Sequence, residues 1–170
     1  QLTPKGIRVP NGFATTASAY QSFLETAGLR ERISRELNIM NPGRVESLQH
    51  HGAIIRHMML DTPLPDDLSH AIIDAYHQLC KERDILADVA VRSSATAEDL
   101  PEASFAGQQE TYLNVRGQAS LLDACRRCFA SLFTDRAISY RAHHGFDHMQ
   151  VALSIGVQQM VRSDIATSGV

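Results

Sequence analysis

The first half of the chain alternates apolar and polar residues at helical spacing. The clearest case follows Pro65-Asp66, a typical helix start, where apolar residues recur three or four positions apart. These residues are Leu68, Ala71, Ile72, Ala75, Tyr76 and Leu79. The same spacing predicts earlier helices from Thr16 to about Gly28, from there to about Leu37, and from Asn41-Pro42 through Met58.

Strand-forming residues become common in the second half. The β-branched run 88–91 predicts a buried strand, the alternation over 110–115 predicts a second, and the apolar stretch 151–161 predicts a central one. The small-residue stretch that begins at Arg92 is expected to be a loop. A helix that carries the cysteines and a short helix over 135–143 fall between the last two strands.

The N-terminal residues differ from the helices that follow them. Residues 7–16 predict a short extended segment with a turn at Asn11-Gly12. The chain as a whole is expected to have an α+β fold. Residues 1–86 would be helix-rich, and residues 87–170 would be sheet-rich and would carry the loop described below.

The charge balance limits the possible partners. Charged residues make up 21% of the 170 residues, and the formal net charge is −3 with neutral histidines. We therefore expect no nucleic-acid or membrane partner. No apolar run reaches the roughly 20 residues of a membrane span, which suggests a soluble, cytoplasmic protein. Because the chain starts at Gln1 and stops at Val170 where an apolar segment begins, we also expect a piece of something longer.

Cys125-Arg-Arg-Cys128 has the spacing of a redox motif. A reactive pair would be expected at a helix N-terminus after a strand, where a thiolate is stabilised. These cysteines fall within an apolar helical stripe instead, so we interpret them as buried packing residues. The eight histidines and the adjacent acids Glu98 and Asp99 are likewise expected to have surface, packing or turn roles, and we predict no metal ligands in this chain.

The segment from Val89 to Val115 has the layout of a phosphate-binding loop between two strands. Gly107 lacks a Cβ and would let the backbone approach an anion. Arg92 could place a bidentate positive charge beside a polyphosphate. Hydroxyl donors are supplied by Ser93, Ser94, Thr96 and Thr111. By composition alone, a capped turn and a surface ion pair are the more common explanations.

The order of residues in this segment is more specific than its composition. Residues 91–101 read Val-Arg-Ser-Ser-Ala-Thr-Ala-Glu-Asp-Leu-Pro, and 103–115 read Ala-Ser-Phe-Ala-Gly-Gln-Gln-Glu-Thr-Tyr-Leu-Asn-Val. They closely resemble the signature of the ATP-binding domain that phosphoenolpyruvate synthases, rifampin phosphotransferases and pyruvate phosphate dikinases share. Residues 129–141, 145–148 and 157–164 fit as well, and 8–16 is the main matching piece before them.

The resemblance implies an ATP-grasp fold, of which this chain would be an incomplete portion, mainly the first lobe. It implies ATP and Mg²⁺ as cofactors. The residues implied to bind the nucleotide are Arg92, Gly107, Thr111, Gln158, Gln159, Met160 and Val161. Arg92 would contact the phosphates, and Gln158 would sit at the adenine-side hinge. Backbone groups from Gln159 to Val161 would meet the adenine edge.

The resemblance also implies elements that this sequence lacks. These are the phosphate-contacting lysine segment, the second grasp lobe with its magnesium ligands, the domain with the phospho-carrier histidine and the pyruvate-binding barrel. The chain alone is therefore expected to bind ATP without turnover, with pyruvate bound elsewhere and a homodimer possible. Residues 146–148 and 160–164 look more like a synthase than a rifampin phosphotransferase. A non-catalytic nucleotide-binding module is the second alternative.

Overall fold

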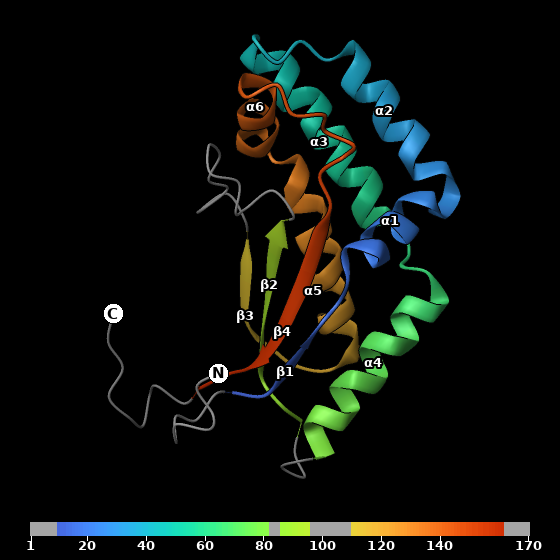
Figure 1. Cartoon of the computed structure of the whole chain (residues 1–170), viewed down its shortest axis with the longest axis vertical. Helices are drawn as coiled ribbons and strands as arrows, with labels where there is room; N and C mark the ends of the chain where they lie inside the picture. Colours follow the sequence, from blue (N-terminus) through green and yellow to red (C-terminus); the bar gives the residue numbers. More distant parts are fainter. Residues whose placement is uncertain (1–9, 82–85, 96–109, 162–170) are drawn as a thin grey trace.

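The computed structural model describes residues 10–81, 86–95 and 110–161 and places helices behind one sheet (Figure 1). The strands are β1 (Gly12–Ala14), β2 (Val89–Ala95), β3 (Thr111–Val115) and β4 (Leu153–Gln159). The α-helices are α1 (Ala17–Glu25), α2 (Leu29–Ile39), α3 (Val45–Asp61), α4 (Asp66–Lys81), α5 (Gln118–Ala130) and α6 (Asp135–His143). Short 3-10 turns, η2 (Thr26–Gly28) and η3 (Ser131–Phe133), follow α1 and α5.

The described strands form a single sheet in the order β1-β4-β2-β3, and each neighbouring pair is antiparallel. β4 is central and pairs with β2 along its whole length, from Leu153 opposite Ala95 to Gln159 opposite Val89. The short β1 covers the other edge of β4. Helices combined with an antiparallel sheet confirm the predicted α+β fold.

The two faces of the sheet differ in burial, because successive side chains along each strand point to opposite faces. In β4, Leu153, Ile155 and Val157 are buried, while the residues between them are partly exposed. Helix α5 packs against β2, β3 and β4, and α1 packs against β4. In Figure 1 the helices lie behind the sheet, so the described portion of the chain leaves the front face uncovered.

An aromatic cluster ties the helical layer together. Tyr20 and Phe23 of α1 lie against Phe129 of α5, with ring centroids 5.3 and 5.5 Å apart. All three side chains are at most 1% exposed. Burial of large aromatic rings is among the strongest stabilising contributions in a core. It holds α1 and α5 together behind β4 and β2.

Three predicted helix starts are confirmed. Helix α1 begins after Thr16, whose Oγ1 accepts a hydrogen bond from the N–H of Ala19 at 3.3 Å. Helix α6 is capped in the same way by Thr134, and it spans the predicted range 135–143. Helix α4 begins at Asp66, with two acidic residues in its first turn, where they complement the helix dipole.

The predicted helix start at Asn41-Pro42 is wrong, because α3 begins at Val45. The Oδ1 of Asn41 accepts a hydrogen bond from the N–H of Gly43 at 3.0 Å, which forms a local turn. The backbone N–H of Asn41 donates to Ser47 Oγ at 2.9 Å. Asn41 therefore stabilises a turn before the helix rather than capping the helix itself.

The predicted turn at Asn11-Gly12 is also wrong. Gly12 is the first residue of β1 and pairs with Gln158. The carbonyl oxygen of Asn11 accepts a hydrogen bond from the N–H of Gln159 at 2.9 Å, which continues the same ladder. Pairing with β4 extends a segment that by itself has the composition of a turn.

None of the helices in the described ranges combines the length and the apolar character that a membrane span needs.

Candidate functional site

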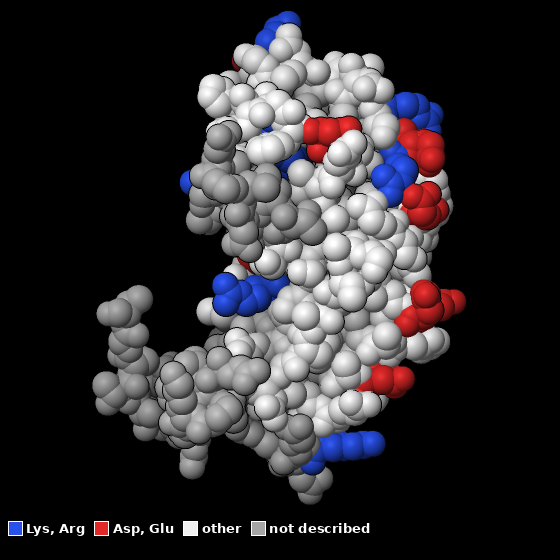
Figure 2. Space-filling model, in the orientation of Figure 1, with Lys and Arg blue, Asp and Glu red and all other residues white. Residues whose placement is uncertain are grey.

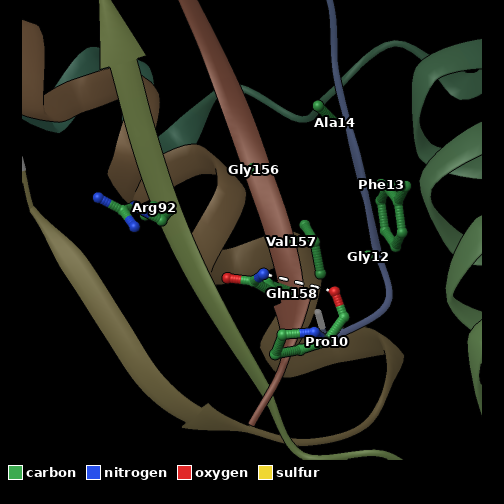
Figure 3. A pocket seen from close by; sticks show the side chains of 8 residues that line it. All are labelled: Pro10, Gly12, Phe13, Ala14, Arg92, Gly156, Val157 and Gln158. Atoms are coloured by element: carbon green, nitrogen blue, oxygen red, sulfur yellow. Dashed lines mark hydrogen bonds between the residues drawn. The ribbon is translucent and has the colours of Figure 1, made fainter. Parts of the chain in front are cut away.

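A hollow of about 430 Å³ lies on the uncovered face of the sheet, over β1, β4 and β2 (Figure 3). Its lining is Pro10, Gly12, Phe13, Ala14, Arg92, Gly156, Val157 and Gln158. Arg92 and Gln158, which the sequence implicated from two distant segments, therefore reach one pocket. The structure thus brings the two ends of the predicted nucleotide site together on adjacent strands.

The strand register explains this arrangement. Ala14 is opposite Gly156, Gly156 is opposite Arg92, and Arg92 is opposite Thr111. Directly paired residues project to the same face of a sheet, so these four form one row across it. Gln158 lies two residues further along β4, between Gly12 and Ala90 in the next row.

Arg92 lies in the interior of β2, and not at a strand end as the sequence predicted. The strand continues to Ala95 because β4 pairs with it along that length. The Arg92 side chain is exposed and has no hydrogen-bond or ion-pair partner within the described ranges 10–81, 86–95 and 110–161. A guanidinium that lines a hollow and projects from a paired strand is well placed to bind a phosphate or carboxylate in bidentate fashion.

The floor of the hollow is made by residues with little or no side chain. Gly156 lies between Arg92 and Ala14, and Gly12 and Ala90 flank Gln158 in the next row. Since these residues leave the backbone of β4 uncovered, a ligand can approach the sheet closely. Arg92 and Gln158 are the two long polar side chains of the lining, and they project from adjacent strands in neighbouring rows.

Gln158 presents a hydrogen-bond acceptor at its end of the hollow. Its Nε2 donates to the carbonyl oxygen of Pro10 at 3.4 Å, which orients the amide (Figure 3). The side-chain oxygen is then directed away from Pro10 and can accept a hydrogen bond from a ligand amino group.

The hydroxyl residues of the predicted phosphate loop divide between the two faces. Thr111 is exposed and pairs with Arg92, so it belongs to the row that crosses the pocket face. Ser93 points the other way: it is 7% exposed, and its Oγ has no hydrogen-bond partner in the described portion of the chain. Gly107 and Thr96, which the sequence also implicated, lie outside the described residues.

The three residues predicted at the adenine edge are placed differently from Gln158. The Gln159 side chain is buried on the helical side of the sheet, and its Nε2 donates to the carbonyl oxygen of Leu79 at 3.3 Å. The Gln159 N–H donates to Asn11 O and the Met160 N–H to Asp88 O, both at 2.9 Å. Val161 is 63% exposed after the end of β4. Of residues 158–161, Gln158 alone lines the hollow.

Charged side chains are unevenly distributed over the face that carries the hollow. Figure 2, which has the orientation of Figure 1, shows the acidic residues of that view mainly over the helices. The described surface over β4 and β1 is mostly uncharged, with basic groups toward β2. This distribution favours an anionic ligand at the Arg92 end.

Cys125 and Cys128 are confirmed as packing residues. Both side chains are 0% exposed on the inner side of α5, and both thiols are free. Burial raises the pKa of the Cys125 thiol to about 12, and burial with the neighbouring Cys125 raises the pKa of Cys128 further above its ordinary value. Thiols of this kind are not thiolates near neutral pH and are poor nucleophiles.

Within the described ranges, no three His, Cys, Asp or Glu residues are close enough to hold a metal ion. Several described histidines instead contact neighbouring side chains. His51 lies 2.7 Å from Glu36, and His144 stacks on Tyr140 with ring centroids 4.1 Å apart.

Sequence reasoning missed the residues of β1 and the glycine of β4 as contributors to the pocket. Residues 8–16 belonged to the resemblance, but no ligand-binding role was inferred for them. Gly156 did carry a signal, since an isolated glycine inside a predicted strand often marks a close approach of the backbone. The register that aligns Gly156 with Arg92 is not visible in the sequence.

The described residues form an α+β domain whose open sheet face carries a hollow. All 170 residues match the model of the family described as "Pyruvate phosphate dikinase, AMP/ATP-binding domain", and the chain belongs to that family. The predicted ATP-grasp class of nucleotide-binding domain and its ligand ATP are thereby supported at the level of the family.

Curated relatives extend this comparison. The chain is 58% identical over 175 residues to the phosphoenolpyruvate synthase of Synechocystis sp. and 56% identical over 169 residues to that of Escherichia coli. It is 45% identical over 169 residues to a probable phosphoenolpyruvate synthase of Methanothermobacter thermautotrophicus. These matches cover 98 to 100% of the chain but only 21, 21 and 24% of the relatives. The chain thus spans about a fifth to a quarter of their length.

Proposed function

We propose that this chain is the ATP-binding region of a phosphoenolpyruvate synthase. The complete enzyme would convert ATP, pyruvate and water to AMP, phosphoenolpyruvate and phosphate. A histidine on a domain outside this chain would carry the phosphoryl group between ATP and pyruvate. Support comes from the family match over 1–170 and from the identity to phosphoenolpyruvate synthases.

The observation that carries the proposal is the position of Arg92. Its exposed guanidinium has no partner among the described residues, and it stands on a paired strand beside a floor of small residues. In phosphoryl transfer, catalysis depends mainly on positioning the phosphates and offsetting their charge. A cation whose backbone is held by strand pairing can perform both tasks without itself forming or breaking a bond.

The other nucleotide contacts follow from the geometry of the pocket. The Gln158 side-chain oxygen would accept a hydrogen bond from the base, and Thr111 would donate to a phosphate next to Arg92. Because the N–H groups of Gln159 and Met160 already donate within the chain, these residues would contact the base through other atoms. Gly107 and Val161 remain in the proposal as backbone contacts.

Magnesium would enter this site with the phosphates of the nucleotide. Its protein ligands would lie on the second grasp lobe that the resemblance implies, outside this chain. The ion would offset phosphate charge during transfer. The pyruvate site would also lie outside this chain, and the enzyme would act in the cytoplasm without a nucleic-acid or membrane partner.

The full-length enzyme that contains this chain provides the test. With ATP, Mg²⁺ and pyruvate, we expect formation of AMP and phosphoenolpyruvate. Arg92→Ala should lower kcat/KM for ATP by about 100-fold, because a charge-assisted hydrogen-bond pair is lost. Arg116→Ala is the matched control: Arg116 is also exposed near the sheet, but it faces Asp88 at 3.9 Å and lies outside the hollow.

Three results would contradict elements of the proposal. ATP consumption with rifampin but not with pyruvate would identify an antibiotic phosphotransferase. ATP binding without any turnover by the full-length protein would favour a non-catalytic module. Equal effects of Arg92→Ala and Arg116→Ala on kcat/KM for ATP would show that the hollow is not the nucleotide site, whichever reaction the enzyme catalyses.

A further inference from the structure

Gly156 lines the hollow on β4, the strand between β1 and β2, although neither its backbone nor its packing requires a glycine. Its φ lies outside the left-handed range that favours glycine, and it pairs with Arg92 on one side and Ala14 on the other. A Cβ at this position would lie 3.6 Å from Arg92 Cγ and 3.8 Å from Arg92 O. Both distances are ordinary van der Waals contacts.

Gly12, in the same pocket, shows what a structurally required glycine looks like. A Cβ on Gly12 would lie 2.3 Å from the carbonyl oxygen of Val157, so β1 could not keep its place beside β4. Gly156 has no such conflict. In a strand interior, a glycine without a packing reason is less favourable than alanine. Its presence therefore points to a requirement outside the fold.

We propose that Gly156 is a specificity-determining residue, because its lack of a side chain leaves space for the ribose of the nucleotide. This inference rests on the proposed function. Gly156 adjoins Arg92, whereas Gln158 lies two residues along the same face of β4, a span of about 7 Å. A nucleotide has its anionic group at one end, its hydrogen-bonding base at the other, and the sugar between them. The sugar would then lie over the bare backbone of Gly156.

This placement separates ligands that carry a sugar from ligands that do not. A methyl group at position 156 would occupy the ribose space but would leave the Arg92 guanidinium accessible. ATP should therefore lose affinity, whereas inorganic tripolyphosphate, which lacks the sugar and the base, should not. Loss of Arg92 should weaken both ligands.

The test measures dissociation constants of ATP and tripolyphosphate, together with the thermal midpoint, for the full-length enzyme. Gly156→Ala should raise the Kd for ATP by about tenfold, which is the cost of overpacking a fitted space. The Kd for tripolyphosphate should not change, and the thermal midpoint should stay equal or rise. Ser154→Ala is the matched control, because Ser154 is on the same face of β4 outside the hollow and should leave both dissociation constants unchanged. Its Oγ donates to the carbonyl oxygen of Ser94 at 3.3 Å, so loss of this hydrogen bond should lower only the thermal midpoint slightly.

Ala14→Val offers an independent approach to the same space, since Ala14 faces Gly156 from β1. It should also raise the Kd for ATP and spare tripolyphosphate. Gly156→Ala with unchanged ATP affinity would overturn the inference. Equal weakening of both ligands together with a lower thermal midpoint would also overturn it, because the glycine would then be structural. If wild-type enzyme does not bind ATP, the proposed function itself fails.

Discussion

The Nε of Arg141 donates a hydrogen bond to the Nδ1 of His148 across 3.0 Å. Arg141 is 0% exposed, and burial lowers the pKa of its guanidinium to about 10. It also donates to the carbonyl oxygen of Leu132 and lies over the Phe133 ring, 5.4 Å from the centroid. His148 belongs to the segment that connects α6 to β4. The hydrogen bond therefore holds this connection against α6 before the chain enters the strand that carries Gly156.

The Arg141–His148 contact makes stability depend on pH. Burial, and then the charge of Arg141, lower the pKa of His148 to about 4 from 6.5, against a smaller opposite effect of Asp147. Between these values the unfolded chain binds a proton that the folded protein does not, so the free energy of unfolding falls as pH decreases. We expect a loss of about 1–2 kcal/mol between pH 7.5 and pH 4.5, allowing for partial solvent exposure of the ring.

His148→Asn isolates this contribution. The Asn side-chain oxygen can accept the Arg141 hydrogen bond but does not titrate in this range. Urea unfolding at several pH values should show a weaker pH dependence for the variant than for wild type, by the same amount of about 1–2 kcal/mol. Parallel pH profiles of the two proteins would show that His148 is protonated normally in the folded state.

Tyr76 provides a second prediction, because its hydroxyl joins three segments of the fold. It donates to the carbonyl oxygen of Ala87 at 2.8 Å and accepts from the N–H of Gly117 at 3.0 Å. Its side chain is 0% exposed. Tyr76→Phe would leave both backbone groups without a partner and should lower the free energy of unfolding by about 1–3 kcal/mol.

Tyr112→Phe is the matched control for that change. The Tyr112 hydroxyl contacts only the exposed carboxylate of Glu110 among the described hydrogen bonds. Its removal should cost less than about 0.5 kcal/mol. Thermal or urea unfolding measures the free energy of unfolding of both variants. Equal losses of that free energy would mean that the Tyr76 hydrogen bonds do not stabilise the contact between the three segments.

The cysteines give a chemical prediction. Cys125 and Cys128 are fully buried with raised pKa values, whereas Cys80 at the end of α4 is only half-buried. Iodoacetamide at pH 8 should label Cys80 in the folded protein and leave the other two unmodified until urea is added. Peptide mass spectrometry distinguishes the three sites. Labelling of Cys125 or Cys128 in the native protein would support the redox interpretation of their spacing.

Local patterns predicted the helices and strands best where capping and apolar spacing agreed. The helix after Pro65 and the helix over 135–143 begin where their first residues indicate, because helix capping and apolar periodicity are local effects. The predictions at Asn41-Pro42 and Asn11-Gly12 were wrong because the backbone conformation at each site depends on a hydrogen-bond or strand partner that competes with the predicted one. Asn41 bonds within a turn, and Gly12 pairs with Gln158 from the other end of the chain.

The sequence by itself determined the α+β composition, the resemblance to the ATP-binding family, and Arg92 and Gln158 as candidate ligand-binding residues. Only the tertiary structure decided that Arg92 is inside a strand, that Ser93 faces away from the pocket, and that Gly156 pairs with Arg92 on the face that carries Gln158. The physical reason is strand register. Side-chain direction alternates every residue, so the pairing of β2 with β4 sets which residues share a face, and this pairing joins segments that are far apart in the sequence.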